Sequence, residues 1–139
     1  MWAEGPYGSL TAARRSRGTV LLIAGGAGIT PLRALFETLP GAGRDLTLLY
    51  RARTAEDLAL REELEAIADD RGAQLLYAVD GPDVRRPSIT AGMLRRILPD
   101  IARHDVDVCG RQGLAVESYA ALRETAVPDR RIHHESFAS

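Results

Sequence analysis

The sequence predicts an α/β fold, a doubly wound five-stranded parallel sheet with helices on both faces. Short apolar, β-like runs alternate along the chain with segments of helical periodicity, which is the pattern of a parallel sheet covered on both sides. The first run, Val20 to Ile23, passes directly into a glycine-rich turn over residues 24–31. The length of 139 residues suits one compact domain.

Five runs are expected as strands, over residues 19–24, 45–51, 74–79, 105–109 and 130–135. Helices are expected over residues 30–39, 57–70, 88–101 and 113–125. Thr30 is predicted to cap the first helix, with Pro31 at its first position, and Thr54 belongs to the cap signal of the second. Pro99 is expected to bend or end the third.

The glycine-rich turn predicts a seat for a phosphate group. Gly25, Gly26 and Gly28 lack a Cβ, so the turn can adopt positive φ and bring its amides close to an anion. The following helix would point the positive end of its dipole at that anion. However, Pro31 replaces the third glycine of the dinucleotide fingerprint. Close packing of a strand on a helix therefore stays an alternative reading of the turn.

The composition argues against several classes of partner. Lys and Arg number 18 and Asp and Glu 19, a net charge of −1, and the basic residues are scattered, so neither nucleic acid nor a membrane surface is expected. The single cysteine excludes an internal disulfide and favours a reducing, cytoplasmic compartment. His104, His133 and His134 have no metal-ligand spacing, and we expect them on the surface with no metal bound.

Polar and glycine residues gather where the predicted strands end, and this is where open α/β sheets bind ligands. In strand order they are the glycine turn, Arg51 and Arg53, Asp80, Cys109 to Gly113, and Glu135 to Phe137. Arginines suit a 2′-phosphate, and Arg51, Arg53, Arg85 and Arg86 therefore favour NADP. Asp80 would instead accept from a free ribose 2′-hydroxyl, as in NAD sites, and solvated surface arginines are the third alternative.

Five motifs in order carry a resemblance to a known family. They are Gly5, Pro6, Tyr7 and Gly8; Gly25 to Pro31; Leu49 to Arg53; Asp107 to Gly110; and His134 to Phe137. The chain resembles the C-terminal pyridine-nucleotide domain of the ferredoxin–NADP reductase superfamily, nearest to bacterial ferric-reductase and NADPH-oxidase-like flavoproteins. It departs at Arg111 and Leu114, where the family commonly has Pro and Met.

The resemblance implies a module that passes hydride from NAD(P)H to FAD, with the FAD held mostly by a preceding β-barrel domain. Residues 1–18 are then expected to be the end of a linker from that flavin domain, with Gly5 to Gly8 on the flavin side, and residues 19–139 to be the NAD(P)-binding domain. The implied electron acceptor is a haem membrane domain or an iron–sulfur protein. The intact protein would lie in the cytoplasm or at the cytoplasmic face of a membrane.

The resemblance also implies roles for individual residues. Pyrophosphate would lie on Gly25, Gly26, Ala27, Gly28, Ile29, Thr30 and Pro31. Thr30 and Cys109 would flank the nicotinamide beside Gly110, Arg111 and Gln112, and Glu135 and Phe137 would lie by the flavin. General statistics leave Cys109 as a small buried hydrophobe and Phe137 as a frayed tail.

Two other functions would fit parts of the same sequence pattern. A non-enzymatic nucleotide-binding or regulatory domain on a flavodoxin-like sheet would show the same alternation of strands and helices, but a receiver of that kind needs an acidic cluster where the first strand ends. Ala24 and Gly25 occupy that place. A stand-alone dehydrogenase is disfavoured because the glycine turn has no acid–base pair beside it.

Overall fold

A computed structural model describes residues 19–39, 45–79 and 89–136. It confirms the predicted fold class, because these residues form one five-stranded parallel sheet in the order β3-β2-β1-β4-β5. The strands are β1 (Val20–Gly25), β2 (Leu46–Ala52), β3 (Gln74–Val79), β4 (Asp105–Gly110) and β5 (Ile132–Ser136). The predicted strands therefore stand, with ends that move by one or two residues.

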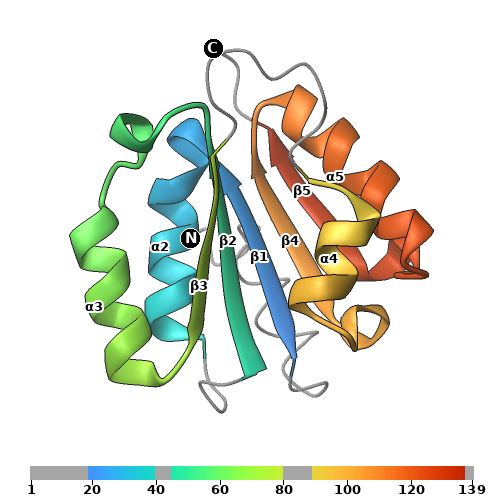
Figure 1. Cartoon of the computed structure of the whole chain (residues 1–139), viewed down its shortest axis with the longest axis horizontal. Helices are drawn as coiled ribbons and strands as arrows, with labels where there is room; N and C mark the ends of the chain where they lie inside the picture. The colour runs from blue at the N-terminus through green and yellow to red at the C-terminus, as the bar shows by residue number, and fades with distance from the viewer. Residues whose placement is uncertain (1–18, 40–44, 80–88, 137–139) are drawn as a thin grey trace, which may run out of the picture.

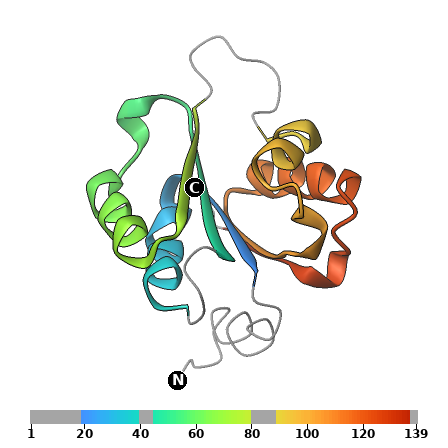
Figure 2. The same cartoon turned by 60° about the horizontal axis from the view of Figure 1, so that its bottom comes forward.

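Four helices pack on this sheet in two layers (Figures 1 and 2). They are α2 (Ile29–Thr38), α3 (Arg61–Arg71), α4 (Ala91–Ile97) and α5 (Gln112–Glu124). Helices α2 and α3 cover one face, and α4 and α5 cover the other, as Figure 2 shows most clearly. Helices on both faces are the arrangement that right-handed crossovers produce.

The central strands contribute side chains to two separate cores. Leu22 and Leu48 belong to the cluster under α2 and α3, whereas Leu21, Ile23 and Leu49 belong to the cluster under α4 and α5. Because successive side chains of a strand point to opposite faces, a strand buried on both sides must be apolar throughout. This requirement explains the continuous apolar run in β1.

The second helix begins later than the sequence predicts. Residues 55–57 form a 3-10 turn, and α3 begins only at Arg61. Leu58 is buried in the core at 7% exposure, and Leu60 has a left-handed backbone with φ 62°. Burying Leu58 therefore takes the chain out of the helical path, and the expected start near Asp57 was wrong. The end at Gly72, whose φ is 67°, was predicted correctly.

Two helix starts also differ from the prediction. Helix α2 begins at Ile29 with Gly28 as its N-cap, so Thr30 lies inside the first turn and does not cap the helix. A threonine cap is found instead at α4, where the hydroxyl of Thr90 accepts from the Met93 amide at 3.1 Å. Helix α4 ends two residues before Pro99, because the residue before a proline is disfavoured in the helical region.

The histidines are less exposed than expected. His104 is buried at 3% exposure, with Nδ1 3.2 Å from the carbonyl oxygen of Asp100. His133 and His134 are half-buried on the edge strand β5. The expectation of three surface histidines was therefore wrong. None of the described helices is long and apolar enough to cross a bilayer.

Candidate functional site

The candidate site lies at the carboxyl edge of the sheet, between β1 and β4. The two strands are neighbours, yet α2 follows β1 on one face and α5 follows β4 on the other. Both helices begin at the same edge (Figure 1). A sheet whose connections diverge in this way leaves a crevice at the switch point, where ligands of open α/β sheets bind.

The turn after β1 brings α2 unusually close to β4. An ideal Cβ on Gly28 would lie 1.9 Å from the carbonyl oxygen of Cys109 and 2.9 Å from the amide nitrogen of Gly110. No side chain fits there, so the glycine is required by packing. Gly26 serves a different purpose: its φ is 54°, and no described atom lies within 4 Å of its ideal Cβ. Only Gly26 in this turn has the positive φ that the sequence suggested.

Leu114 of α5 packs over the same crevice. Its Cδ2 would be 2.9 Å from a Cβ on Gly25 and 2.8 Å from a Cβ on Gly110. The two glycines therefore let α5 approach the ends of β1 and β4. This contact gives a structural role to Leu114, which stands where the resemblance leads one to expect Met.

Two helices begin at this edge without a side-chain cap from the described part of the chain, α5 directly and α2 through a 3-10 turn over Gly26–Gly28, whose carbonyl oxygens at Gly26 and Ala27 accept from the Ile29 amide. Among the described residues, no side chain caps α2 or α5, and the first turn of each helix contains no acidic residue. Their N-cap residues are Gly28 and Arg111, and the first turns expose Thr30 and Gln112. The positive ends of two helix dipoles favour an anionic group at this edge.

A second set of predicted residues aligns across the sheet. Cys109 is the Cα partner of Ala24 on one side and of Glu135 on the other. The thiol is 1% exposed and belongs to the core cluster under α2 and α3. Burial is the main cause that raises its pKa to about 12, and the negative charges of Asp107 and Glu135 contribute to the same shift. Cys109 is thus a neutral thiol in the wall of the site, which is the buried alternative that the sequence left open.

Arg51 near the end of β2 and Arg53 just after it lie on the other side of the glycine turn. Arg51 is the Cα partner of Gly25, and its guanidinium lies 3.7 Å from the carboxylate of Glu117 in α5. Arg53 is exposed. Glu117 could not be predicted from the sequence as a site residue, because only the packing of α5 on the sheet brings it to β2.

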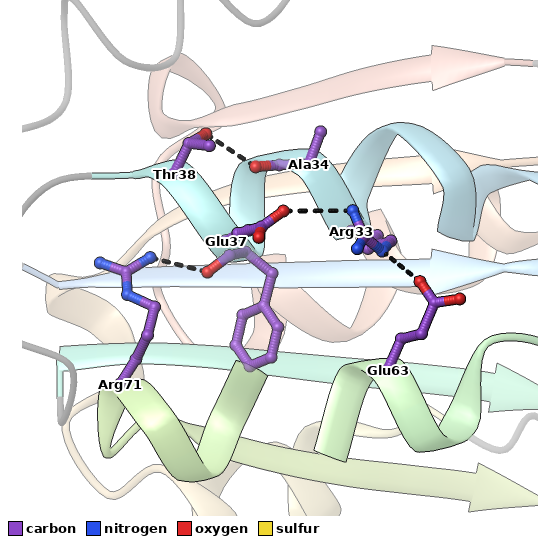
Figure 3. Close-up of polar contacts among 7 residues, drawn as sticks. Arg33, Ala34, Glu37, Thr38, Glu63 and Arg71 are labelled. Carbon is purple, nitrogen blue, oxygen red and sulfur yellow. Dashed lines mark hydrogen bonds and ion pairs between the residues drawn. The ribbon is translucent and has the colours of Figure 1, made fainter. Parts of the chain in front are cut away.

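Polar contacts of Arg33 and Arg71 join α2 to α3 (Figure 3). Arg33 contacts Glu37 at 3.1 Å and Glu63 at 2.8 Å. Arg71 donates to the carbonyl oxygens of Phe36 and Leu39, which lie where α2 ends and have no helical partner of their own. These contacts fix the direction of the helix whose other end faces the crevice.

Several predicted site residues lie outside the described residues. They are Gly5, Pro6, Tyr7, Gly8, Asp80, Arg85, Arg86 and Phe137. Within the described part, the structure brings the glycine turn, Arg51, Cys109, Gly110, Arg111 and Glu135 to one edge.

A family comparison agrees with this geometry. Residues 22–118 match the sequence profile of the oxidoreductase NAD-binding domain. The chain belongs to this family. The NAD-binding domain lies within the ferredoxin reductase superfamily, which confirms the broader resemblance, while a special likeness to ferric reductases or NADPH oxidases is not supported.

Similar proteins are reductases or parts of them. The reductase component of propane 2-monooxygenase from Rhodococcus jostii is 29% identical over 97% of this chain and 40% of its own length. Ferredoxin–NADP reductase B from Sorangium cellulosum is also 29% identical, over 97% of this chain and 61% of its own length. This NAD-binding domain thus spans about half the length of such relatives.

A solved structure shows the same fold. The FAD/NAD-binding domain of nitric oxide dioxygenase from Vibrio cholerae is 27% identical and superposes with a TM-score of 0.73. The similarity covers 91% of this chain and 52% of that one.

Proposed function

We propose that this NAD-binding domain holds NAD(P)H at the β1–β4 crevice and presents its nicotinamide to an FAD carried mainly by a separate domain. The observation that carries the proposal is that α2 and α5 begin at one edge of the sheet without a side-chain cap from the described residues or an acidic residue in the first turn, where Gly28 packs against the Cys109 carbonyl. A dinucleotide pyrophosphate is the anion that suits this arrangement. The relatives whose names contain reductase support the same assignment.

The strand order suggests how the nucleotide lies. With pyrophosphate at the turn after β1, the adenosine end would extend toward β2, where Arg51 and Arg53 are, and the nicotinamide end toward β4 and β5. Cys109 and Glu135, which are register partners, would then border the nicotinamide. Phe137 is proposed to join them from beyond the described residues.

The chemistry needs little acid–base work from the chain. Hydride leaves the nicotinamide with its electron pair, which yields NAD(P)⁺, and the flavin supplies the acceptor when it is bound. The protein therefore has to orient the two rings and keep water out of the space between them. A buried neutral thiol beside Glu135 suits such a wall, since it adds no charge next to the ring.

The remaining parts of the proposal concern the whole protein. Residues 1–18 would link the domain to a preceding flavin domain, and a haem domain or an iron–sulfur protein would accept the electrons. The protein would work in the cytoplasm or at the cytoplasmic face of a membrane. The exposed Arg53, which follows β2 directly, favours NADP over NAD in this proposal.

Calorimetry with NADP⁺, NAD⁺ and FAD tests the proposal on this chain. We expect weak binding of at least one nucleotide, no tight FAD binding and no diaphorase activity. Tight flavin binding or turnover by the chain alone would contradict the proposal that a separate domain holds most of the FAD. Failure to bind either nucleotide would overturn the proposal as a whole.

A pair of glycine variants tests the location of the site. Gly26→Val and Gly72→Val each place a β-branched residue at a positive φ, 54° and 67°, with open space around the Cβ. Gly26 lies in the crevice, whereas Gly72 follows α3 at the opposite edge. Only Gly26→Val should abolish nucleotide binding. Equal losses in both variants would mean that general destabilisation is responsible.

A further inference from the structure

Arg51 is placed where it would meet the adenosine end of a nucleotide, but it is already engaged. Its Cα lies beside that of Gly25 in the register of β1 and β2. Its guanidinium lies 3.7 Å from Glu117 Oε1, and the side chain is about one-third exposed, at 32%. The positive charge nearest to the glycine turn on β2 is therefore offset by a carboxylate from α5.

Glu117 is held in place by a second contact. Its Oε2 accepts a hydrogen bond from the backbone amide of Ile89 at 2.7 Å, and its side chain is only 12% exposed. The carboxylate is thus fixed between β2 and the residue that precedes α4. If Arg51 turned toward a ligand, its ion pair with a carboxylate that is only 12% exposed would be lost, which costs free energy in a partly desolvated place.

We propose that Glu117 is a specificity-determining residue, which withholds Arg51 from the 2′-phosphate and so lowers the preference of the site for NADP over NAD. The inference rests on the proposed nucleotide site. A 2′-phosphate is the group that separates the two nucleotides, and arginine is the side chain that suits it best.

Arg53 differs from Arg51 in its side-chain contacts. It follows β2 directly, and no ion pair or hydrogen bond reaches its side chain from the described part of the chain. Arg53 can therefore turn to a ligand without abandoning a buried partner. Of the two arginines at this strand end, Arg53 is therefore the one more available to bind a 2′-phosphate.

Glu117→Gln is the decisive variant. The glutamine keeps the shape of the side chain and an oxygen that can accept from Ile89, but it removes the charge that holds Arg51. Glu117→Ala removes both, and it serves as a second variant if the glutamine disturbs folding. The double variant Arg51→Gln with Glu117→Gln restores the neutrality of the pair without an arginine.

A control comes from the far end of the same helix. Arg123 of α5 pairs with Asp129 at 3.0 and 3.1 Å, next to the start of β5 and so at the opposite edge of the sheet. Asp129→Asn removes a carboxylate from an arginine there. It should leave the binding of both nucleotides unchanged.

The measurement is the ratio of NADP⁺ to NAD⁺ affinity by calorimetry at low ionic strength, with circular dichroism to verify folding. We expect Glu117→Gln and Glu117→Ala to raise this ratio about fivefold or more. The affinity for NAD⁺ should stay within about twofold of wild type, because NAD⁺ has no 2′-phosphate for the released Arg51 to bind. The double variant should return to the wild-type ratio.

The outcomes separate the two proposals. An unchanged ratio in the folded Glu117 variants, or a gain that persists without Arg51, would overturn the role of Glu117 while leaving the nucleotide site intact. Wild-type protein that binds neither nucleotide would overturn the site, and this inference with it.

Discussion

Gly28 and Cys109 touch through their backbones: a Cβ on Gly28 would lie 1.9 Å from the Cys109 carbonyl oxygen and 2.4 Å from its carbonyl carbon. The contact joins the start of α2 to the end of β4, two elements on either side of the switch point. The close packing of α2 on β4 at the switch point therefore requires a residue without a side chain at position 28.

This contact predicts that two glycines of one turn respond differently to alanine. Gly28→Ala forces the methyl group into the backbone of β4, so helix or strand must move, at a cost of about 1–3 kcal/mol or more. Gly26→Ala meets no described atom and carries only the strain of a left-handed residue, about 1–2 kcal/mol. Urea unfolding measures both losses.

The comparison also has a structural readout. Gly28→Ala should alter the amide NMR signals of Cys109 and Gly110, whereas Gly26→Ala should leave them in place. Equal stability losses with no change at Cys109 would show that the close approach is not maintained in solution.

A second prediction concerns the two threonines at helix starts. Thr90→Ala removes the hydroxyl that accepts from the Met93 amide, and should reduce the free energy of unfolding by about 1 kcal/mol. Thr30→Ala removes no cap, because Thr30 is exposed within the first turn of α2. Thermal and urea unfolding compare the two. A larger loss at Thr30 would restore the assignment made from the sequence.

These threonines show why helix starts were harder to predict than strands. A Thr-Pro pair is typical of a helix start, and local chemistry alone favours Thr30 as the cap. In the fold, the N-cap is Gly28, which packs against β4, so the helix begins two residues earlier. Leu58 acts similarly before α3, since its burial decides where the helix begins.

The first strand was predictable because a strand buried on both faces needs a continuous apolar run, and the sequence displays it in β1. The ends of the strands could be placed on one edge from parallel topology alone. The pair of Arg51 and Glu117 could not be predicted, because it depends on how α5 lies across the sheet. No local pattern marks Glu117 as different from any other helical glutamate.

The third prediction follows from the buried thiol. The folded protein raises the pKa of Cys109 to about 12 from an ordinary value of 9.0. Below pH 9 the thiol is protonated in both states. Above it, the unfolded chain releases the proton while the folded chain keeps it, so stability falls as the pH rises from about 9 toward 12, by at most about 1.4 kcal/mol per pH unit.

Cys109→Ala separates the alkaline loss of stability that Cys109 causes from the loss that titrating tyrosines cause. Burial raises the pKa of Tyr50 and Tyr119, and that of Tyr77 to about 12, so all three also contribute at alkaline pH. Wild type and Cys109→Ala both contain these tyrosines, so their contributions cancel in the difference between the two free energies of unfolding. Urea unfolding from pH 8 to 10.5 should show the advantage of wild type over Cys109→Ala shrinking. A constant difference would mean that the thiol titrates normally when folded.

The last prediction concerns hydride transfer in a protein that contains both the flavin domain and this one. Cys109 and Glu135 are register partners at the ends of β4 and β5, where the proposed nicotinamide lies. Glu135→Ala and Phe137→Ala should slow flavin reduction in stopped flow far more than they weaken NADPH binding, because contacts near the reacting rings matter most in the transition state.

Cys109→Ala distinguishes a thiol that borders the nicotinamide from one that serves packing alone. If the thiol borders the nicotinamide, flavin reduction should slow about ten- to a hundredfold, or about 1.4–2.7 kcal/mol of transition-state positioning. A residue that serves packing alone would instead lower the unfolding temperature and leave the reduction rate unchanged. Weaker nucleotide binding with normal reduction rates in all three variants would place them at the adenosine end. Because strand order fixes which residues share an end, that result would reverse the whole orientation of the nucleotide, and Arg51 and Arg53 would then border the nicotinamide.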